Sequence, residues 1–225
     1  MLEVGALLPP GDPLASSLAL GMPIGVLVID LLSRRRLRIN GQAWLPGDGT
    51  LRVAIDEAFW NCPKYIQSRE LSAPRELERG TQVPRSGSRL EPDQRAFVEA
   101  ADTLFVASAH EGSGADASHR GGLPGFVRVS GADTVIFPDY AGNGMFQTLG
   151  NFVADGRAGL LFPDFERGRT LQLTGRASIE WEPSGAGSGP GAERVVRVKI
   201  ERWVEQIGIT SLLGRLVERS PHNPK

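Results

Sequence analysis

An ungapped internal repeat is the sequence feature that most constrains the fold of this chain. The segment Gly25–Ala43, GVLVIDLLSRRRLRINGQA, lies without gaps over Gly159–Ala177, GLLFPDFERGRTLQLTGRA, with seven of 19 positions identical. In each copy an apolar run ends at an aspartate, a polar turn follows, and alternating apolar residues lead to a glycine. This pattern is typical of a β-hairpin. The repeat therefore predicts two hairpins whose backbones superpose, each within a barrel-like sheet.

The alternation also predicts which side of each hairpin is buried. Leu37 and Ile39 in the first copy, and Leu171 and Leu173 in the second, fall on one face because strand side chains alternate between faces. Only 24 residues precede Gly25, whereas more than a hundred separate the two copies. We therefore expect the first copy to supply a hairpin but not a complete ligand site.

The rest of the chain favours a mainly β protein with a few helices. Its 28 glycines and 16 prolines punctuate many short apolar runs. Strands are predicted at residues 50–56, 103–110, 125–130, 134–140 and 194–203, a glycine-rich loop up to Gly122, and helices at 91–101 and 145–153. Several antiparallel strands with an interposed helix indicate a small closed barrel. The predicted organisation is a partial module over residues 1–67, a linker or mobile loop over 68–90, and a complete domain over 91–225.

Composition excludes several classes of function. The formal net charge of −1 shows no basic footprint for nucleic acid. A single cysteine, Cys62, excludes an intrachain disulfide, and the scattered His110, His119 and His222 predict no metal site. The N-terminus lacks a basic segment before its apolar stretch, and no uncharged apolar run reaches the roughly 18 residues of a membrane span. We expect a cytoplasmic protein without an export signal and without a membrane partner.

The densest cluster of polar groups indicates an anionic ligand. It comprises Ser118–Val129, SHRGGLPGFVRV, and Phe137–Asn151, FPDYAGNGMFQTLGN. Glycines let the main chain approach a ligand, a helix N-terminus offers free N–H groups, and His119, Arg120 and Arg128 offer positive charge. Tight barrel turns with solvated arginines are the alternative that the residues alone leave open.

At these segments the chain resembles a known family. ADTLFVAS, SHRGGLPGF, FPDYAGNGMFQTLGN, RAGLLFPDF and LTGRA, spanning Ala101–Ala177, follow the order seen in flavin-nucleotide-binding proteins related to pyridoxamine 5'-phosphate oxidase. NCPKYIQ, Asn61–Gln67, is similar to the middle of the two-module members. The resemblance implies an FMN-binding split β-barrel, with a partial second barrel-like module at the N-terminus. It also implies a homodimer with the flavin near the subunit interface.

The resemblance further implies which residues bind the cofactor. They surround the strand at 125–130 and the following helix start: His119, Arg120, Gly125, Phe126, Arg128, Asp139, Tyr140, Asn143, Gln147, Thr148 and Asn151. Arg128 stands where the oxidases have a lysine, and Thr148 where they have a basic residue. The FMN phosphate is therefore expected between Arg128 and the turn at 143–151.

The reaction stays open at this point. Residues 211–225 have no similarity to the oxidases' C-terminal substrate-binding segment, so the pyridoxal-forming activity does not carry over. The leading hypothesis is an FMN-dependent oxidoreductase whose substrate and electron partner are unidentified. The alternatives are a flavin-binding or flavin-carrier module without turnover, and a split barrel that binds haem or a deazaflavin.

Other prominent residues have structural interpretations beside functional ones. Cys62 is interpreted as a small buried hydrophobe or as a redox thiol near the flavin, and Tyr65 as a packing residue or as a ligand contact. His119 either fixes a loop or bonds the flavin. The run Arg34–Arg36 is interpreted as a solvated hairpin turn. The four tryptophans are expected to be core or interface anchors.

Overall fold

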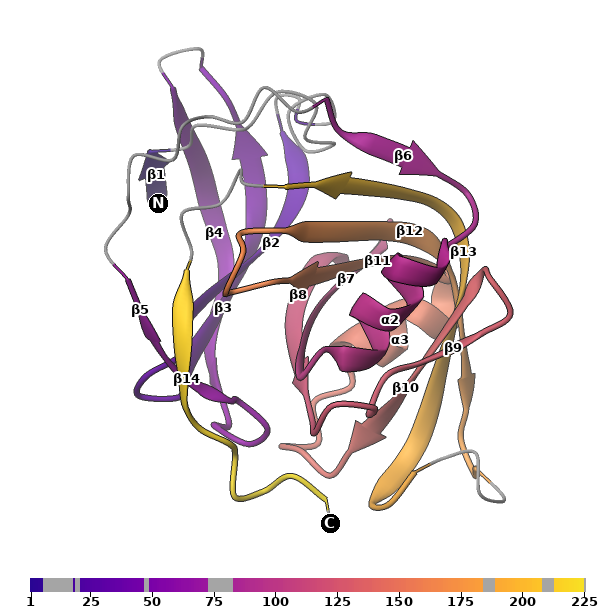
Figure 1. Cartoon of the computed structure of the whole chain (residues 1–225). Helices are drawn as coiled ribbons and strands as arrows, with labels where there is room; N and C mark the ends of the chain where they lie inside the picture. The colour runs from indigo at the N-terminus through magenta and orange to yellow at the C-terminus, as the bar shows by residue number, and fades with distance from the viewer. Residues whose placement is uncertain are drawn as a thin grey trace.

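The computed structural model describes residues 1–5, 18, 21–46, 49–72, 83–183, 189–207 and 213–224. These residues form antiparallel strands and two helices, so the predicted mainly β fold class is confirmed (Figure 1). None of the helices in this part of the chain is long and apolar enough to cross a membrane.

The N-terminal residues form a four-stranded antiparallel sheet with the order β1-β4-β3-β2. Its strands are β1 (Leu2–Gly5), β2 (Met22–Asp30), β3 (Arg35–Trp44) and β4 (Thr50–Asn61). A small apolar cluster around Val53 and Ala43 packs within this sheet. The N-terminal module therefore has its own sheet, at the upper left of Figure 1.

The C-terminal residues form a larger antiparallel sheet with the order β8-β7-β11-β12-β13-β10-β9, and β6 also pairs with β13. Its strands are β6 (Arg85–Gly87), β7 (Thr103–His110), β8 (Gly114–Gly121), β9 (Arg128–Ser130), β10 (Thr134–Tyr140), β11 (Arg157–Pro163), β12 (Thr170–Glu180) and β13 (Ala192–Gln206). The curled sheet encloses the main core, in which Phe137, Phe162, Leu171 and Val198 are almost wholly buried.

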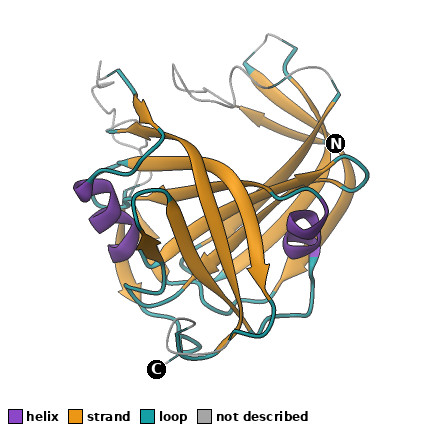
Figure 2. Ribbon diagram, turned by 90° about the vertical axis from the view of Figure 1, so that its right-hand side faces the viewer, coloured by secondary structure: helices purple, strands orange, loops and turns teal. Residues whose placement is uncertain are grey.

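Two helices complete the C-terminal module at the predicted positions. Helix α2 (Pro92–Ala100) begins with a proline, whose missing N–H costs nothing at that position. The Gln94 side chain accepts the backbone N–H of Glu91 at 3.1 Å and closes the first turn. Helix α3 (Gln147–Ala154) packs against β7 and β12. Figure 2 shows the two helices on opposite sides of the strands.

Both copies of the repeat are hairpins, as predicted. β2 pairs with β3, and β11 pairs with β12. In the first turn Asp30 Oδ1 accepts the N–H groups of Leu32 and Ser33, and in the second Asp164 accepts those of the two corresponding residues. The shared aspartate thus closes both turns in the same way.

Two segments differ from the sequence-based expectation. Residues 68–90, expected to be a linker, form strands at both ends, because β5 (Ser68–Leu71) pairs with β14 (Gly214–Glu218) and β6 pairs with β13. The loop expected before Gly122 contains β8, which pairs with β7 along its length. Partners distant in sequence set β5 and β6, and β8 is rich in glycine and polar residues, so local composition did not show these strands.

The two modules meet where β2 and β3 lie against β8. Gly25 of β2 is one point of close approach, since a Cβ placed there would lie 2.6 Å from the backbone nitrogen of Ala117. No side chain fits at that distance without moving a backbone. The glycine that begins the first repeat copy therefore permits the contact between the modules.

Candidate functional site

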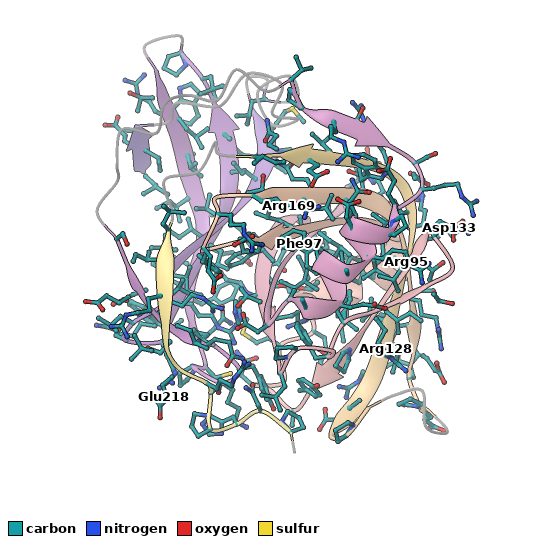
Figure 3. All side chains as sticks on the ribbon, in the orientation of Figure 1. Arg95, Phe97, Arg128, Asp133, Arg169 and Glu218 are labelled. Carbon is teal, nitrogen blue, oxygen red and sulfur yellow. The ribbon has the colours of Figure 1, made fainter. Side chains whose placement is uncertain are left out.

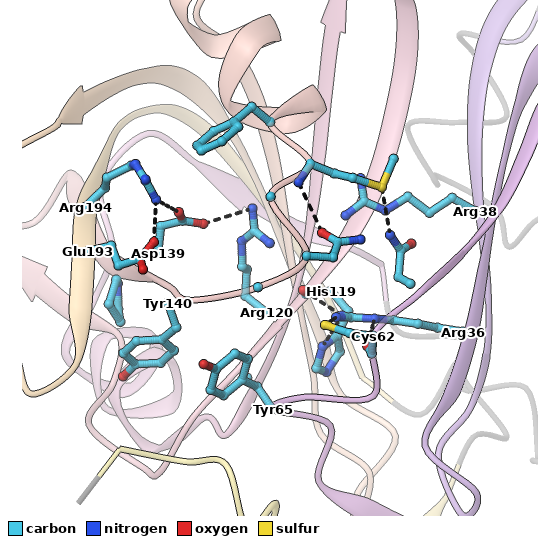
Figure 4. Close-up of a pocket in the computed structure, with 18 residues that line it drawn as sticks. Arg36, Arg38, Cys62, Tyr65, His119, Arg120, Asp139, Tyr140, Glu193 and Arg194 are labelled. Atoms are coloured by element: carbon cyan, nitrogen blue, oxygen red, sulfur yellow. Dashed lines mark hydrogen bonds and ion pairs between the residues drawn. The ribbon is translucent and has the colours of Figure 1, made fainter.

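A pocket lies between the two modules (Figure 4). The N-terminal wall is formed by strands β3 and β4 and the NCPKYIQ segment. Its lining residues are Arg36, Arg38, Asn61, Cys62 and Tyr65. The cavity has a volume of about 70 Å³ and opens to the surface.

The C-terminal wall is formed by the end of β8, the end of β10, the loop before α3 and the start of β13. Its lining residues are His119, Arg120, Gly121, Pro138, Asp139, Tyr140, Gly142, Asn143, Gly144, Met145, Phe146, Glu193 and Arg194. Both walls thus come from one chain, and neither module forms the pocket alone.

Arg36 is a buried cation at the base of this pocket. Its Nε donates to the Cys62 carbonyl at 2.9 Å, and its Nη1 donates to the carbonyl of His119 at 3.1 Å. It is only 7% exposed, and within the described part of the chain it forms no ion pair with a carboxylate. Burial lowers the pKa of Arg36 from its ordinary value. Because a guanidinium stays charged in proteins, a buried positive charge remains without a counter-anion.

His119 lies beside Arg36 and is held neutral. Arg36 Nη1 lies 3.1 Å from His119 Nδ1, and a guanidinium only donates, so Nδ1 accepts and the ring proton sits on Nε2. Burial, together with the positive charges of Arg36 and Arg120, holds the pKa of His119 well below its ordinary value. His119 is therefore a neutral hydrogen-bond donor toward its Nε2 side.

Arg38, in contrast, is neutralised by a carboxylate. Its Nη1 lies 3.0 and 3.1 Å from the two carboxyl oxygens of Asp116, and both side chains are almost wholly buried. The hydroxyl of Thr148 donates to the same carboxylate at 2.6 Å. This network joins β3, β8 and α3 across the module boundary.

Asp139 joins the two remaining arginines of the pocket. Arg120 Nη2 lies 3.4 Å from one of its oxygens, and Arg194 Nη1 lies 3.0 Å from the other. Arg194 also contacts Glu193 at 2.9 Å and lies over the Phe146 ring at 4.7 Å. Four arginines and two carboxylates therefore line the pocket, which leaves it positively charged.

Three buried donors on pocket-lining residues have no partner within the described part of the chain. Among the described residues, His119 Nε2, Arg120 Nε and Arg38 Nε are buried without a hydrogen-bond acceptor. Buried donors are normally satisfied in native proteins. Unpaired donors and excess positive charge in one cavity fit an anionic group with several acceptor oxygens, such as a phosphate.

Tyr65 closes one side of the pocket. Its hydroxyl donates to the Ala141 carbonyl at 2.9 Å, and its ring lies 5.1 Å from the ring of Tyr140. Its backbone φ is +66°, a left-handed conformation that costs a residue other than glycine about 1–3 kcal/mol. The surrounding contacts must therefore hold this residue in place.

The structure brings together five of the eleven residues that the sequence proposed as ligands. His119, Arg120, Asp139, Tyr140 and Asn143 line the pocket. The other six lie outside its lining: Gly125, Phe126, Arg128, Gln147, Thr148 and Asn151.

Contacts elsewhere occupy several of those six. Thr148 bonds Asp116, Asn151 donates to Ser108 at 3.1 Å, and Gln147 donates to Glu57 of β4 at 3.0 Å. Arg128 lies on β9, the strand that packs against α2 (Figure 3). The cation and the turn of the predicted phosphate site thus do not meet in this pocket.

Arg36 and Arg38 line the pocket but were not among the ligand residues predicted from the sequence. The interpretation of Arg34–Arg36 as a solvated turn is wrong for Arg36, because β3 begins at Arg35 and its alternation directs Arg36 and Arg38 toward β8. The sequence already indicated that Arg36 and Arg38 share one face of a strand, since they alternate with Leu37 and Ile39. Trp203 is buried as expected, whereas Trp60 and Trp181 are exposed.

The state of His119 predicts a pH dependence of stability. On unfolding, His119 regains its ordinary pKa near 6.5, so below that pH the unfolded chain binds more protons than the folded one. Stability is therefore full above about pH 6.5 and falls by up to about 1.4 kcal/mol per pH unit as the pH drops toward the lowered pKa. Urea unfolding of wild type and His119→Gln at several pH values between neutral and mildly acidic measures this. His119→Gln keeps an acceptor for Arg36, so its free energy of unfolding should fall less steeply than that of wild type as the pH drops. An equal dependence on pH in the two proteins would contradict a neutral His119.

Comparison with known proteins identifies one family. A family model described as pyridoxamine 5'-phosphate oxidase matches residues 90–207. No curated protein matches the chain.

Solved structures give matches of low identity. A pyridoxamine 5'-phosphate oxidase candidate from Lactobacillus delbrueckii is 13% identical, with a TM-score of 0.40, and the match covers 52% of this chain and 94% of that one. HupZ from Group A Streptococcus is 15% identical, with a TM-score of 0.40, covering 58% and 98%. An FMN-binding protein from Syntrophomonas wolfei is 12% identical, with a TM-score of 0.36, covering 49% and 82%.

Proposed function

The chain belongs to the pyridoxamine 5'-phosphate oxidase family, and from that premise we propose that it is a flavoprotein that binds FMN in the pocket between its two modules. The observation that carries the proposal is the group of buried donors around Arg36 that have no acceptor among the described residues, together with the Arg36 charge, which has no carboxylate partner among the same residues. A phosphate dianion supplies both the charge and the acceptors that these residues lack. We place the FMN phosphate there, rather than beside Arg128.

The size of the cavity indicates that it holds only part of the FMN molecule. Its volume of about 70 Å³ is far below the roughly 300–1,000 Å³ of pockets that hold a whole ligand. The cavity therefore takes the phosphate end, and the ring system lies at the mouth along Asn143–Phe146, where Met145 and Phe146 are exposed. Bound FMN supplies hydride or electron transfer, and the protein binds and orients it.

The pocket geometry also bears on stoichiometry. Both walls belong to one chain, so we propose one FMN per chain. The homodimer with the flavin near the subunit interface, expected from sequence, stays a proposal. Light scattering at micromolar concentration measures that assembly.

The absorption spectrum of the purified protein, before and after incubation with FMN, tests the choice of cofactor. We expect the paired near-ultraviolet and blue bands of a bound flavin. A haem Soret band or the single violet band of a deazaflavin would overturn the FMN assignment. Reduction of the bound flavin by a nicotinamide donor, followed by reoxidation, would support an oxidoreductase; a flavin that binds but never turns over would indicate a carrier.

A further inference from the structure

We propose that the C-terminal tail, residues 219–224, holds Tyr65 as a gate across the mouth of the pocket. The proposal rests on the assignment of that pocket as the FMN site, but it concerns entry and release. It gives a role to a segment that the family resemblance left unexplained.

The gate itself is the contact between Tyr65 and the opposite wall. The Tyr65 hydroxyl donates to Ala141, the residue between Tyr140 and Gly142 of the C-terminal wall. The Tyr65 and Tyr140 rings lie side by side at the lower end of the pocket in Figure 4. This contact joins the two walls across the side of the pocket that Tyr65 lines, and the proposed gate lies there.

The tail holds the backbone of Tyr65 directly. Ser220 Oγ accepts the Tyr65 N–H at 3.1 Å, and the Gln67 side chain donates to the Tyr65 carbonyl at 3.2 Å. Both hydrogen bonds act on a residue whose positive φ is unfavourable for tyrosine. The hydrogen bond from the tail thus helps to stabilise the unfavourable backbone conformation of Tyr65.

Gln67 connects the tail to the pocket wall. Its amide nitrogen also lies 3.1 Å from the Gly122 carbonyl oxygen and 3.2 Å from Asn223 Oδ1, so its two hydrogens serve three nearby acceptors, while its oxygen accepts the Ser220 N–H at 2.9 Å and Asn223 Nδ2 at 3.1 Å. Gln67, Ser220 and Asn223 are all buried. Such a fully satisfied buried network fixes one arrangement of its members.

Two further contacts bring the tail to this place. β14 pairs with β5 immediately before the tail, at the left of Figure 1. Arg34 Nη2 contacts Glu218 at 2.7 Å, and Arg34 Nε donates to the Ile66 carbonyl at 3.1 Å. The tail is therefore built into the N-terminal wall.

Cys62 supplies a readout that does not depend on flavin. It lines the pocket and is the only cysteine of the chain, so its labelling rate with an aromatic disulfide reagent reports access to the pocket. Three full-length variants are compared with wild type: Tyr65→Phe, the tail variant Ser220→Ala/Asn223→Ala, and the two combined. Arg215→Ala, an exposed residue of β14, is the matched control.

We expect Tyr65→Phe and the tail variant each to speed Cys62 labelling about 5- to 10-fold, because each removes about one hydrogen bond made by Tyr65 itself, to Ala141 or to Ser220. The combined variant should be no faster than either alone, because both remove the same closed state. Labelling of the tail variant at the wild-type rate, or a multiplied effect in the combination, would overturn the gate. Protection of wild-type Cys62 by FMN tests the proposed function separately, since its absence would leave the labelling result intact.

Discussion

Arg36→Ala is expected to weaken FMN binding about 10- to 100-fold, equivalent to about 1.4–2.8 kcal/mol. Arg36 is buried at the base of the pocket and has no carboxylate partner within the described part of the chain. Its charge-assisted hydrogen bonds to a phosphate would each contribute about 1.5–3 kcal/mol. Fluorescence titration of flavin into the apo-protein measures the affinity.

A second flavin, riboflavin, and two further variants, Arg35→Ala and Arg128→Ala, separate the loss of a phosphate contact from a general loss of structure. Riboflavin lacks the phosphate, so its affinity should change little in Arg36→Ala. Arg35→Ala is the matched control, because Arg35 points to the other face of β3 and lies over the Trp60 ring at 5.1 Å. A loss of FMN affinity in Arg128→Ala but not in Arg36→Ala would return the phosphate to the position expected from sequence.

Gly25→Ala is expected to destabilise the protein by about 3 kcal/mol, the upper end of typical overpacking costs. The new Cβ would lie 2.6 Å from the backbone of both Asp116 and Ala117, so β2 must move away from β8. Because that contact holds together the two modules whose facing walls form the pocket, FMN and riboflavin should lose affinity together. Urea unfolding measures the first effect and flavin titration the second.

The repeat itself supplies the control for this prediction. Gly159 occupies the position equivalent to Gly25, but a Cβ there would meet only the Ala107 side chain, at 3.3 Å. Gly159→Ala should therefore stay within about 1 kcal/mol of wild type. Similar destabilisation by both substitutions would show that the module contact is not the cause.

Much of the fold could be predicted from local sequence. The hairpins follow from alternation and from an aspartate at each turn, and β7 and β10 have the bounds that their apolar runs indicate. These features depend on neighbours along the chain. The strands β5, β6 and β8 could not be predicted in this way, because their pairing depends on distant partners or on sequence rich in glycine and polar residues.

The pocket was harder to predict because burial of a charge depends on what packs over it. From sequence, Arg36 was interpreted as part of a basic turn. In the fold, β8, which lies about eighty positions later in the chain, covers the face of β3 that carries Arg36. Thr148 was predicted to bind the cofactor, but its hydroxyl donates a hydrogen bond to Asp116. The role of the tail likewise required the fold, since Gln67 and Ser220 are far apart in sequence.

Titration of FMN and riboflavin into the wild-type apo-protein tests whether the pocket binds the FMN phosphate. We expect one FMN per chain, bound at least about tenfold more tightly than riboflavin, because the phosphate fills a cavity lined by residues with unpaired buried donors. Equal affinities for the two flavins, or no binding of either, would contradict an FMN phosphate site at Arg36, His119 and Arg120.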